Sequence, residues 1–213
     1  MIKRFIMAAG LFSSISSMAA MPIDGFYSSI FGGYTYLPNN IDTIHNGILL
    51  DNSSFTGGYN AGGRFGYKSN PLRYEGEFTY LSASAQRFYA NHIKQTDVSG
   101  QSSGVFLMAN VYYDFPEVLD SLQPFLGIGI GYGFVKDNLD STGPGTALNF
   151  SGSNSVFSYQ GTAGIAYHFA ENYSLDLAYR YIATDHSNEL GSIFQANLAS
   201  VGVTYRFDDA QYK

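Results

Sequence analysis

The chain has 213 residues, of which 13% are charged and 45% hydrophobic, with 24 glycines, 18 tyrosines and 17 phenylalanines. A soluble domain averages about 25% charged residues, so this composition indicates that much of the surface faces something other than water. The 17 acidic residues outnumber the 11 basic ones, which argues against nucleic acid as a partner. The absence of cysteine excludes disulfides and thiolate metal sites.

Residues 1–20 have the organisation of an export signal. Lys3 and Arg4 precede an apolar centre at 5–15, and small residues that include Ala19 and Ala20 follow. We therefore predict a signal peptide over 1–20, cleaved after one of these two alanines. A membrane anchor helix is the alternative, but the apolar part is shorter than the ~20 residues that a spanning helix needs and is interrupted by serines.

Seven of eight strand-like segments alternate at every second position between apolar and small or polar residues, as a strand between two different media does. In one of them Phe65 and Tyr67 alternate with Arg64 and Lys68. The expected strands are 26–37, 58–68, 72–80, 103–114, 124–135, 156–169, 173–182 and 195–207. Both faces of 26–37 are apolar, so its outward face stays open at this point.

The predicted connections alternate in length. Long polar connections cover 38–56, 82–102, 136–155 and 184–193. The other three are tight turns at 69–71 and 170–172 and an intermediate connection at 115–123, where 116–120 could form a helical turn. Outer-membrane barrels have this asymmetry, with short periplasmic turns and longer extracellular loops.

Aromatic residues collect near the short turns, at the height where rings lie at a membrane–water boundary. They are Tyr67, Tyr74, Tyr167, Phe169 and Tyr173. With the alternating strands, this predicts an eight-stranded antiparallel up-and-down transmembrane β-barrel over 21–207, closed by its last strand and followed by a tail at 208–213. A soluble lipocalin-like barrel is the alternative fold, and the sparse charge argues against it.

Seven charged residues lie on the polar faces of the predicted strands. They are Arg64, Arg73, Glu75, Glu77, Asp114, Asp176 and Arg180. Eight strands enclose just enough room for side chains, and charges buried there must be paired. We predict a structural ion network that fills the lumen. A gate or narrow water path in which the pairs exchange partners is the alternative.

The alternating glycines of 127–133 do not form a nucleotide-binding loop. Such a loop needs glycine three residues after its second glycine, and Gly129 has Tyr132 there. We expect the glycines to make inward space for bulky neighbours. These neighbours are Phe106, Met108 and Tyr112.

Metal and catalytic sites have weak support. The histidines at 45, 92 and 186 lie in three different long connections without ligand spacing, and the aspartates at 137, 140 and 185 lack the spacing of a calcium loop. A lipid-modifying enzyme would need a fixed histidine, serine and carboxylate. His186, Ser187 and Glu189 are the candidates, but they lie in a loop. We predict no catalytic, cofactor-binding or metal residues.

Three segments, 125–134, 173–181 and 201–207, resemble the small bacterial outer-membrane β-barrel family, which includes opacity-type surface proteins and the OmpA-type membrane domain. The resemblance implies a Gram-negative outer membrane, surrounding lipids, assembly by the barrel-insertion machinery and a non-enzymatic surface protein. Its four long loops would contact host surface or matrix molecules, and we expect a monomer. A small low-conductance pore and a lipid-modifying enzyme are the alternatives.

The chain departs from the family at its end. The family's terminal aromatic is usually the last residue, whereas 208–213 follow Phe207 here. We still expect Phe207 to serve as the assembly signal. No peptidoglycan-binding domain follows, so the resemblance does not imply a tether to the cell wall.

Overall fold

The computed structural model describes residues 24–38, 43–45, 48–55, 57–90, 93–94, 99–119, 121–141, 148–185 and 193–207. Its strands are β1 (Gly25–Tyr36), β2 (Thr43–His45), β3 (Ile48–Phe55), β4 (Gly58–Ser69), β5 (Leu72–Ala90), β6 (Ile93–Lys94), β7 (Ser99–Asp114), β8 (Leu122–Ser141), β9 (Leu148–His168), β10 (Tyr173–Thr184) and β11 (Gln195–Arg206). In these ranges no helix has the length and apolar character to cross a bilayer.

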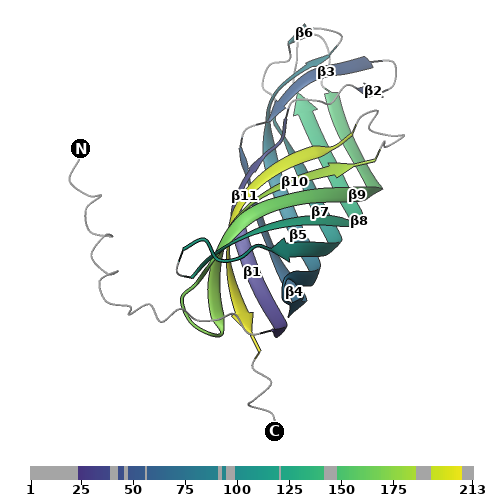
Figure 1. Ribbon diagram of the computed structural model, residues 1–213. Coiled ribbons are helices and arrows are strands. Elements are labelled where there is room, and N and C mark those ends of the chain that lie inside the picture. Colours follow the sequence, from purple (N-terminus) through teal and green to yellow (C-terminus); the bar gives the residue numbers. More distant parts are fainter. Residues whose placement is uncertain are drawn as a thin grey trace, which may run out of the picture.

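Eight of the strands form a closed antiparallel barrel (Figure 1). The pairing runs β1–β4–β5–β7–β8–β9–β10–β11 and returns to β1. The closing ladder joins β1 to β11 from Tyr27 opposite Arg206 to Tyr36 opposite Asn197. The fold class predicted from the alternating strands is therefore confirmed, and the last strand closes the barrel because it pairs with the first.

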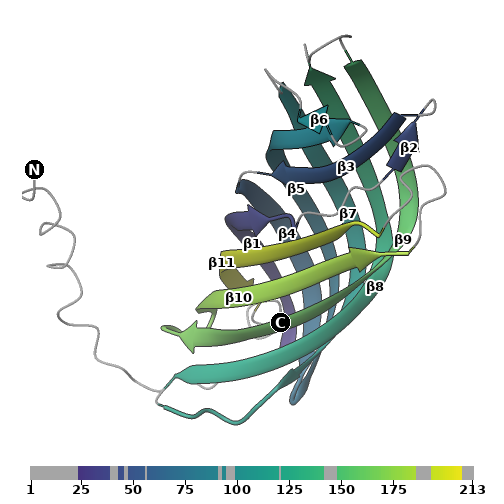
Figure 2. The same cartoon turned by 90° about the horizontal axis from the view of Figure 1, so that it is seen from above.

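Three of the predicted long loops are partly sheet. β5 continues to Ala90, and β8 and β9 stay paired until Ser141 lies opposite Leu148. β2, β3 and β6 lie at the same end, where β3 pairs with the outer part of β5 (Figures 1 and 2). Alternation marks only the length over which a strand separates two media. Beyond that length the backbone hydrogen-bond ladder continues although the residues no longer alternate. The strands predicted from the sequence are therefore shorter than the observed ones.

The sequence suggested a possible helical turn at 116–120, but its described residues 116–119 are not helical. The amide of Val118 donates to the carbonyl of Leu122 at 3.1 Å, and Leu119 forms an isolated bridge with Leu122. The amide of Phe115 likewise donates to the carbonyl of Pro124 at 2.9 Å. These bonds across the connection satisfy backbone groups that would otherwise favour a helical turn.

The outward face of the barrel is apolar and the inward face is polar around most of the wall. The structure settles the face of β1 that the sequence left open, because Ile30 is 72% exposed while Tyr27 and Phe31 are buried. Since every second residue of each barrel strand points to the lumen, the polar parity of the other strands becomes the lining of the lumen.

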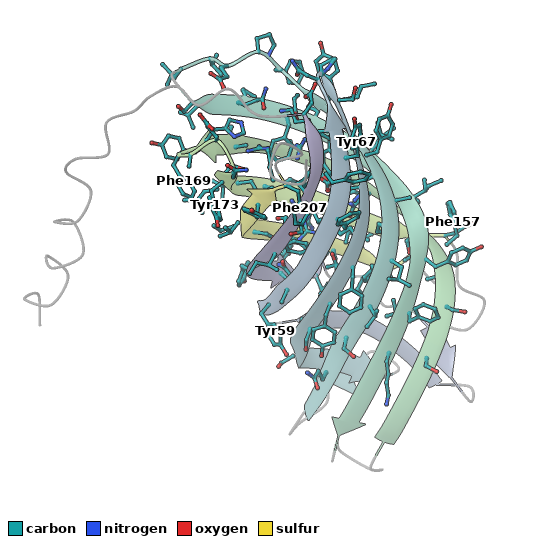
Figure 3. All side chains as sticks on the ribbon, turned by 90° about the horizontal axis from the view of Figure 1, so that it is seen from below. Tyr59, Tyr67, Phe157, Phe169, Tyr173 and Phe207 are labelled. Carbon is teal, nitrogen blue, oxygen red and sulfur yellow. The ribbon has the colours of Figure 1, made fainter. Side chains whose placement is uncertain are left out.

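Aromatic rings form a collar near the short turns. The ring of Tyr173 lies 6.1 Å from Phe169 and 5.0 Å from Tyr205, whose own ring lies 5.3 Å from Phe207. Figure 3 shows Phe169, Tyr173 and Phe207 together at one end of the barrel. Outward rings at this height suit the membrane–water boundary, and these contacts include two of the five rings expected there from the sequence, Phe169 and Tyr173.

Candidate functional site

All seven predicted lumen charges lie inside the barrel and are linked by ion pairs. Arg180 donates to Glu77 at 2.7 Å, and Arg64 contacts Glu77 at 3.1 Å and Asp176 at 3.4 Å. Because β5 and β10 are not neighbours in the barrel, the pair between Glu77 and Arg180 crosses the lumen. The network therefore ties together walls that the backbone ladder does not join.

The same two guanidinium groups also contact a ring. The Cζ atoms of Arg64 and Arg180 lie 4.4 and 4.1 Å from the centroid of Phe31. An aromatic face stabilises a buried cation electrostatically, and this partly replaces the hydration that the cation loses on burial. Nη1 and Nη2 of Arg180 also reach three neutral oxygens, whereas its Nε has no hydrogen-bond partner among the described residues. The three oxygens belong to Asn60, Thr79 and Ser200.

A second group of ion pairs lies nearer the short turns. Asp114 accepts from Lys68 and from Arg73, each at 2.8 Å. Arg73 also reaches Glu75 at 3.2 Å, and the hydroxyl of Tyr27 donates to the same carboxylate. Asp114 thus bridges two cations, while Glu75 connects this group to Arg64 at 3.8 Å.

At the turn end of the lumen a histidine completes a chain of polar contacts. Arg206 Nη2 lies 3.1 Å from His168 Nδ1, and His168 Nε2 lies 3.2 Å from Gln123 Oε1, which also accepts from Lys68 at 3.0 Å. Arginine only donates, so Nδ1 accepts and Nε2 carries the proton. His168 is therefore a neutral relay between Arg206 and Gln123 in this arrangement.

The sequence prediction of the network omitted Lys68, His168 and Arg206. Each is buried in the lumen and lies at or next to the end of its strand. Their inward position can be read from the sequence, because Lys68, His168 and Arg206 have the same parity as the buried polar residues of their own strands. Those residues are Arg64 on β4, Thr162 on β9 and Ser200 on β11. The sequence does not give the register of the strands, which places the ends of β4, β9 and β11 at the same height along the barrel.

An apolar layer closes the lumen on the side of the long connections. Phe106, Ile182 and Leu198 are fully shielded from solvent there, and the ring of Phe194 stacks on Phe106 at 5.9 Å. Ile182 and Leu198 come two residues beyond Arg180 and Ser200 on their strands, toward the loop end. The other members of the layer are Leu37, Leu81, Ala83, Met108, Val135 and Ala196. Apolar constrictions exclude water, so this layer blocks a path that the ion pairs alone would leave polar.

The alternating glycines of β8 make room for inward side chains, as predicted for two of the three neighbours. A Cβ on Gly127 would collide with the ring of Tyr112, and one on Gly133 would lie 2.5 Å from Phe106 Cε1. At Gly131 the obstacle is instead the backbone of Leu107 and Met108. Glycine is thus required where β8 passes the widest side chains of β7.

The remaining candidates of the sequence lie largely outside the described residues. This holds for His92, for the group His186, Ser187 and Glu189, and for the side chains of His45, Asp137 and Asp140. Within the described ranges, no group of three or more histidine or acidic side chains could hold a metal ion. The expectation of no catalytic, cofactor or metal residue remains a prediction.

Comparison with known proteins gives a consistent picture. A family model described as an outer membrane protein β-barrel domain matches residues 5–207. An opacity protein of Neisseria gonorrhoeae is 29% identical over 148 residues, which cover 54% of this chain and 59% of that protein. An outer membrane protein of Gluconacetobacter diazotrophicus is 30% identical over 193 residues, covering 77% and 49%. The chain thus spans about half to three fifths of these relatives.

Two solved structures share the fold. Neisserial surface protein A aligns with a TM-score of 0.56 at 18% identity, over 86% of this chain and 97% of that one. A major outer membrane protein from Thermus thermophilus aligns with a TM-score of 0.51 at 13% identity, over 85% and 99%. At these low sequence identities, the similarity shows that the barrel fold is shared.

Proposed function

The chain belongs to the outer membrane protein β-barrel domain family, and from this premise we propose that it is a non-enzymatic surface protein which contacts external molecules through its loop end. It is a barrel of the bacterial outer membrane, of the type found in opacity proteins. The proposal concerns the adhesive role. The observation that carries it is the filled lumen, which leaves the exterior of the barrel as its working surface.

The filled lumen argues against the alternative of a small pore. A water path along the axis would have to pass the apolar layer around Phe106 and Leu198 and then the pair between Arg180 and Glu77. Opening the ion pairs would expose their charges, but it would leave the apolar layer in place. The gate considered from sequence thus needs two separate rearrangements.

The loop end supports surface contacts because it is built from sheet. β8 has 20 residues and β9 has 21, whereas a tilted strand crosses a bilayer in about 9–11. About half of each strand therefore extends outside the membrane as a paired ribbon, seen beside β2 and β3 in Figure 1. The backbone of a paired ribbon is already ordered, so binding through it loses less conformational entropy than binding through a free loop would.

Deleting part of this ribbon tests the proposal. Residues 138–151 would be replaced by Asn-Gly, a two-residue hairpin turn, and cells displaying the variant would be assayed for adhesion to host surfaces or matrix proteins. Adhesion should fall strongly while the barrel stays folded, as judged by its altered gel migration before boiling. A matched replacement of 186–192 is the control for loss of a different loop. Undiminished adhesion of both variants would contradict the proposal.

The remaining partners that we propose follow from the membrane setting. Outer-membrane lipids surround the apolar band, and the barrel-insertion machinery recognises the closing strand together with Phe207, which follows it. The signal at 1–20 directs export and is removed. With a closed wall and no open sheet edge around the eight described barrel strands, the barrel can remain a monomer.

A further inference from the structure

The described lumen holds one more cation than carboxylates. Its charged side chains are Arg64, Lys68, Arg73, Arg180 and Arg206 against Glu75, Glu77, Asp114 and Asp176. Each of the four carboxylates has a cationic side chain within 4.0 Å. In the described ranges, however, no carboxylate lies within 4.0 Å of Arg206. The excess charge is thus located at Arg206.

Arg206 is also short of hydrogen-bond acceptors. The residue is only 6% exposed, and its Nε and Nη1 atoms have no hydrogen-bond partner among the described residues. Nη2 alone is engaged, at 3.1 Å from His168 Nδ1 and 3.4 Å from Ser174 Oγ, both neutral groups. Buried donors on a charged group are costly when they lack an acceptor. Two such donors on one side chain indicate a missing partner.

Arg206 borders a small cavity at the turn end of the lumen. Lys68, His168, Ser174 and Thr204 line it with Arg206. The space open to the centre of a water-sized species is about 10 Å³, which matches roughly one such species. The cavity therefore has room for a single small occupant, and Arg206 is one of the residues that line it.

We propose that this cavity binds one small monovalent inorganic anion of the size of chloride. An anion accepts from Nε and Nη1 and also balances the excess cation, whereas a water molecule could accept these hydrogen bonds but carries no charge. Asp114 and Asp176 line the same cavity, so a multivalent oxyanion such as sulfate would meet like charge as well as insufficient space. The lumen then contains five cations balanced by four carboxylates and one bound anion.

Chloride NMR line widths test this directly on the folded full chain in nonionic detergent micelles. The wild-type protein should broaden the chloride signal, and bromide should compete the broadening away. Arg206→Gln should lose most of the excess width. Lys136→Gln removes one positive charge at an exposed position on β8, so it controls for surface binding and should retain the width. Equal broadening by wild type and Arg206→Gln would overturn the proposal.

A second variant keeps the test valid if Arg206→Gln fails to fold. Ser174→Asp places a carboxylate beside Arg206 Nη2 and supplies the missing charge covalently. The wild-type melting temperature should rise by roughly 2–4 °C when chloride replaces gluconate at constant ionic strength. Ser174→Asp should melt higher without chloride and show no further rise. A chloride response in Ser174→Asp equal to that of wild type, or no response in wild type, would overturn the proposal.

Discussion

Arg180 and Glu77 form an ion pair of 2.7 Å that joins opposite walls of the barrel, and neither side chain is exposed to solvent. Removing one partner leaves the other charge buried, which costs more than the pair itself contributes. Glu77→Gln should therefore destabilise the folded barrel by about 3–5 kcal/mol, because Arg64 and Arg180 both lose their shared carboxylate. Urea unfolding in detergent micelles measures this loss.

The control for that variant is Glu171→Gln, at an exposed turn position. It should change the free energy of unfolding by less than about 0.5 kcal/mol. Adding Arg180→Met to Glu77→Gln should recover part of the loss, since the uncompensated cation is removed. Equal stability of Glu77→Gln and wild type would show that the network does not hold the lumen together.

Added volume should destabilise the barrel at an inward glycine but not at an outward one. At Gly133 a new Cβ would lie 2.5 Å from Phe106 and 2.8 Å from Ser158 Oγ, whereas at Gly161 it would meet nothing within 4 Å. Gly133→Val should cost about 1–3 kcal/mol through overpacking, and Gly161→Val should be close to neutral. Both are read from the same unfolding curves, and equal costs would mean that the inward face is not tightly packed.

Much of this fold could be predicted because lipid and lumen impose opposite demands on alternate residues. The parity of Phe65 and Arg64 is by itself enough to place one ring outward and one charge inward. The apolar layer was less predictable, because Phe106 and Leu198 share an inward parity with polar residues. Only the register of β7 against β11 around the barrel reveals that they meet at one height.

The outer sheet could not be predicted for a different reason. Beyond the length that crosses the membrane, lipid no longer covers one face of β8 and β9, so alternation between lipid and lumen does not apply there. The extension depends on continuous backbone pairing, as between Ser141 and Leu148, which side-chain patterns do not encode. Likewise, the parity of Arg206 places it inward, but its lack of a carboxylate partner depends on distances across the lumen.

The closing strand leads to a prediction about assembly. The amide of Phe207 donates to the carbonyl of Phe26 at 2.9 Å, and its ring lies 5.3 Å from that of Tyr205. We propose that this aromatic end is the insertion signal, so Phe207→Ala should reduce the amount of folded protein in outer membranes. Removing 208–213 should leave insertion intact. Gel migration before and after boiling reports the folded fraction, and normal insertion of Phe207→Ala would place the signal elsewhere.

Conductance in planar lipid bilayers tests the filled lumen most directly. Phe106→Gly and Leu198→Gly open the apolar layer, and Glu77→Gln added to them removes the ion pair, so this triple variant is the one in which some water and ion passage is expected. The wild-type barrel should show no unitary current steps, because the apolar layer and the pair between Arg180 and Glu77 block the axis in series. Regular current steps from the purified wild-type protein would contradict the account and favour a pore.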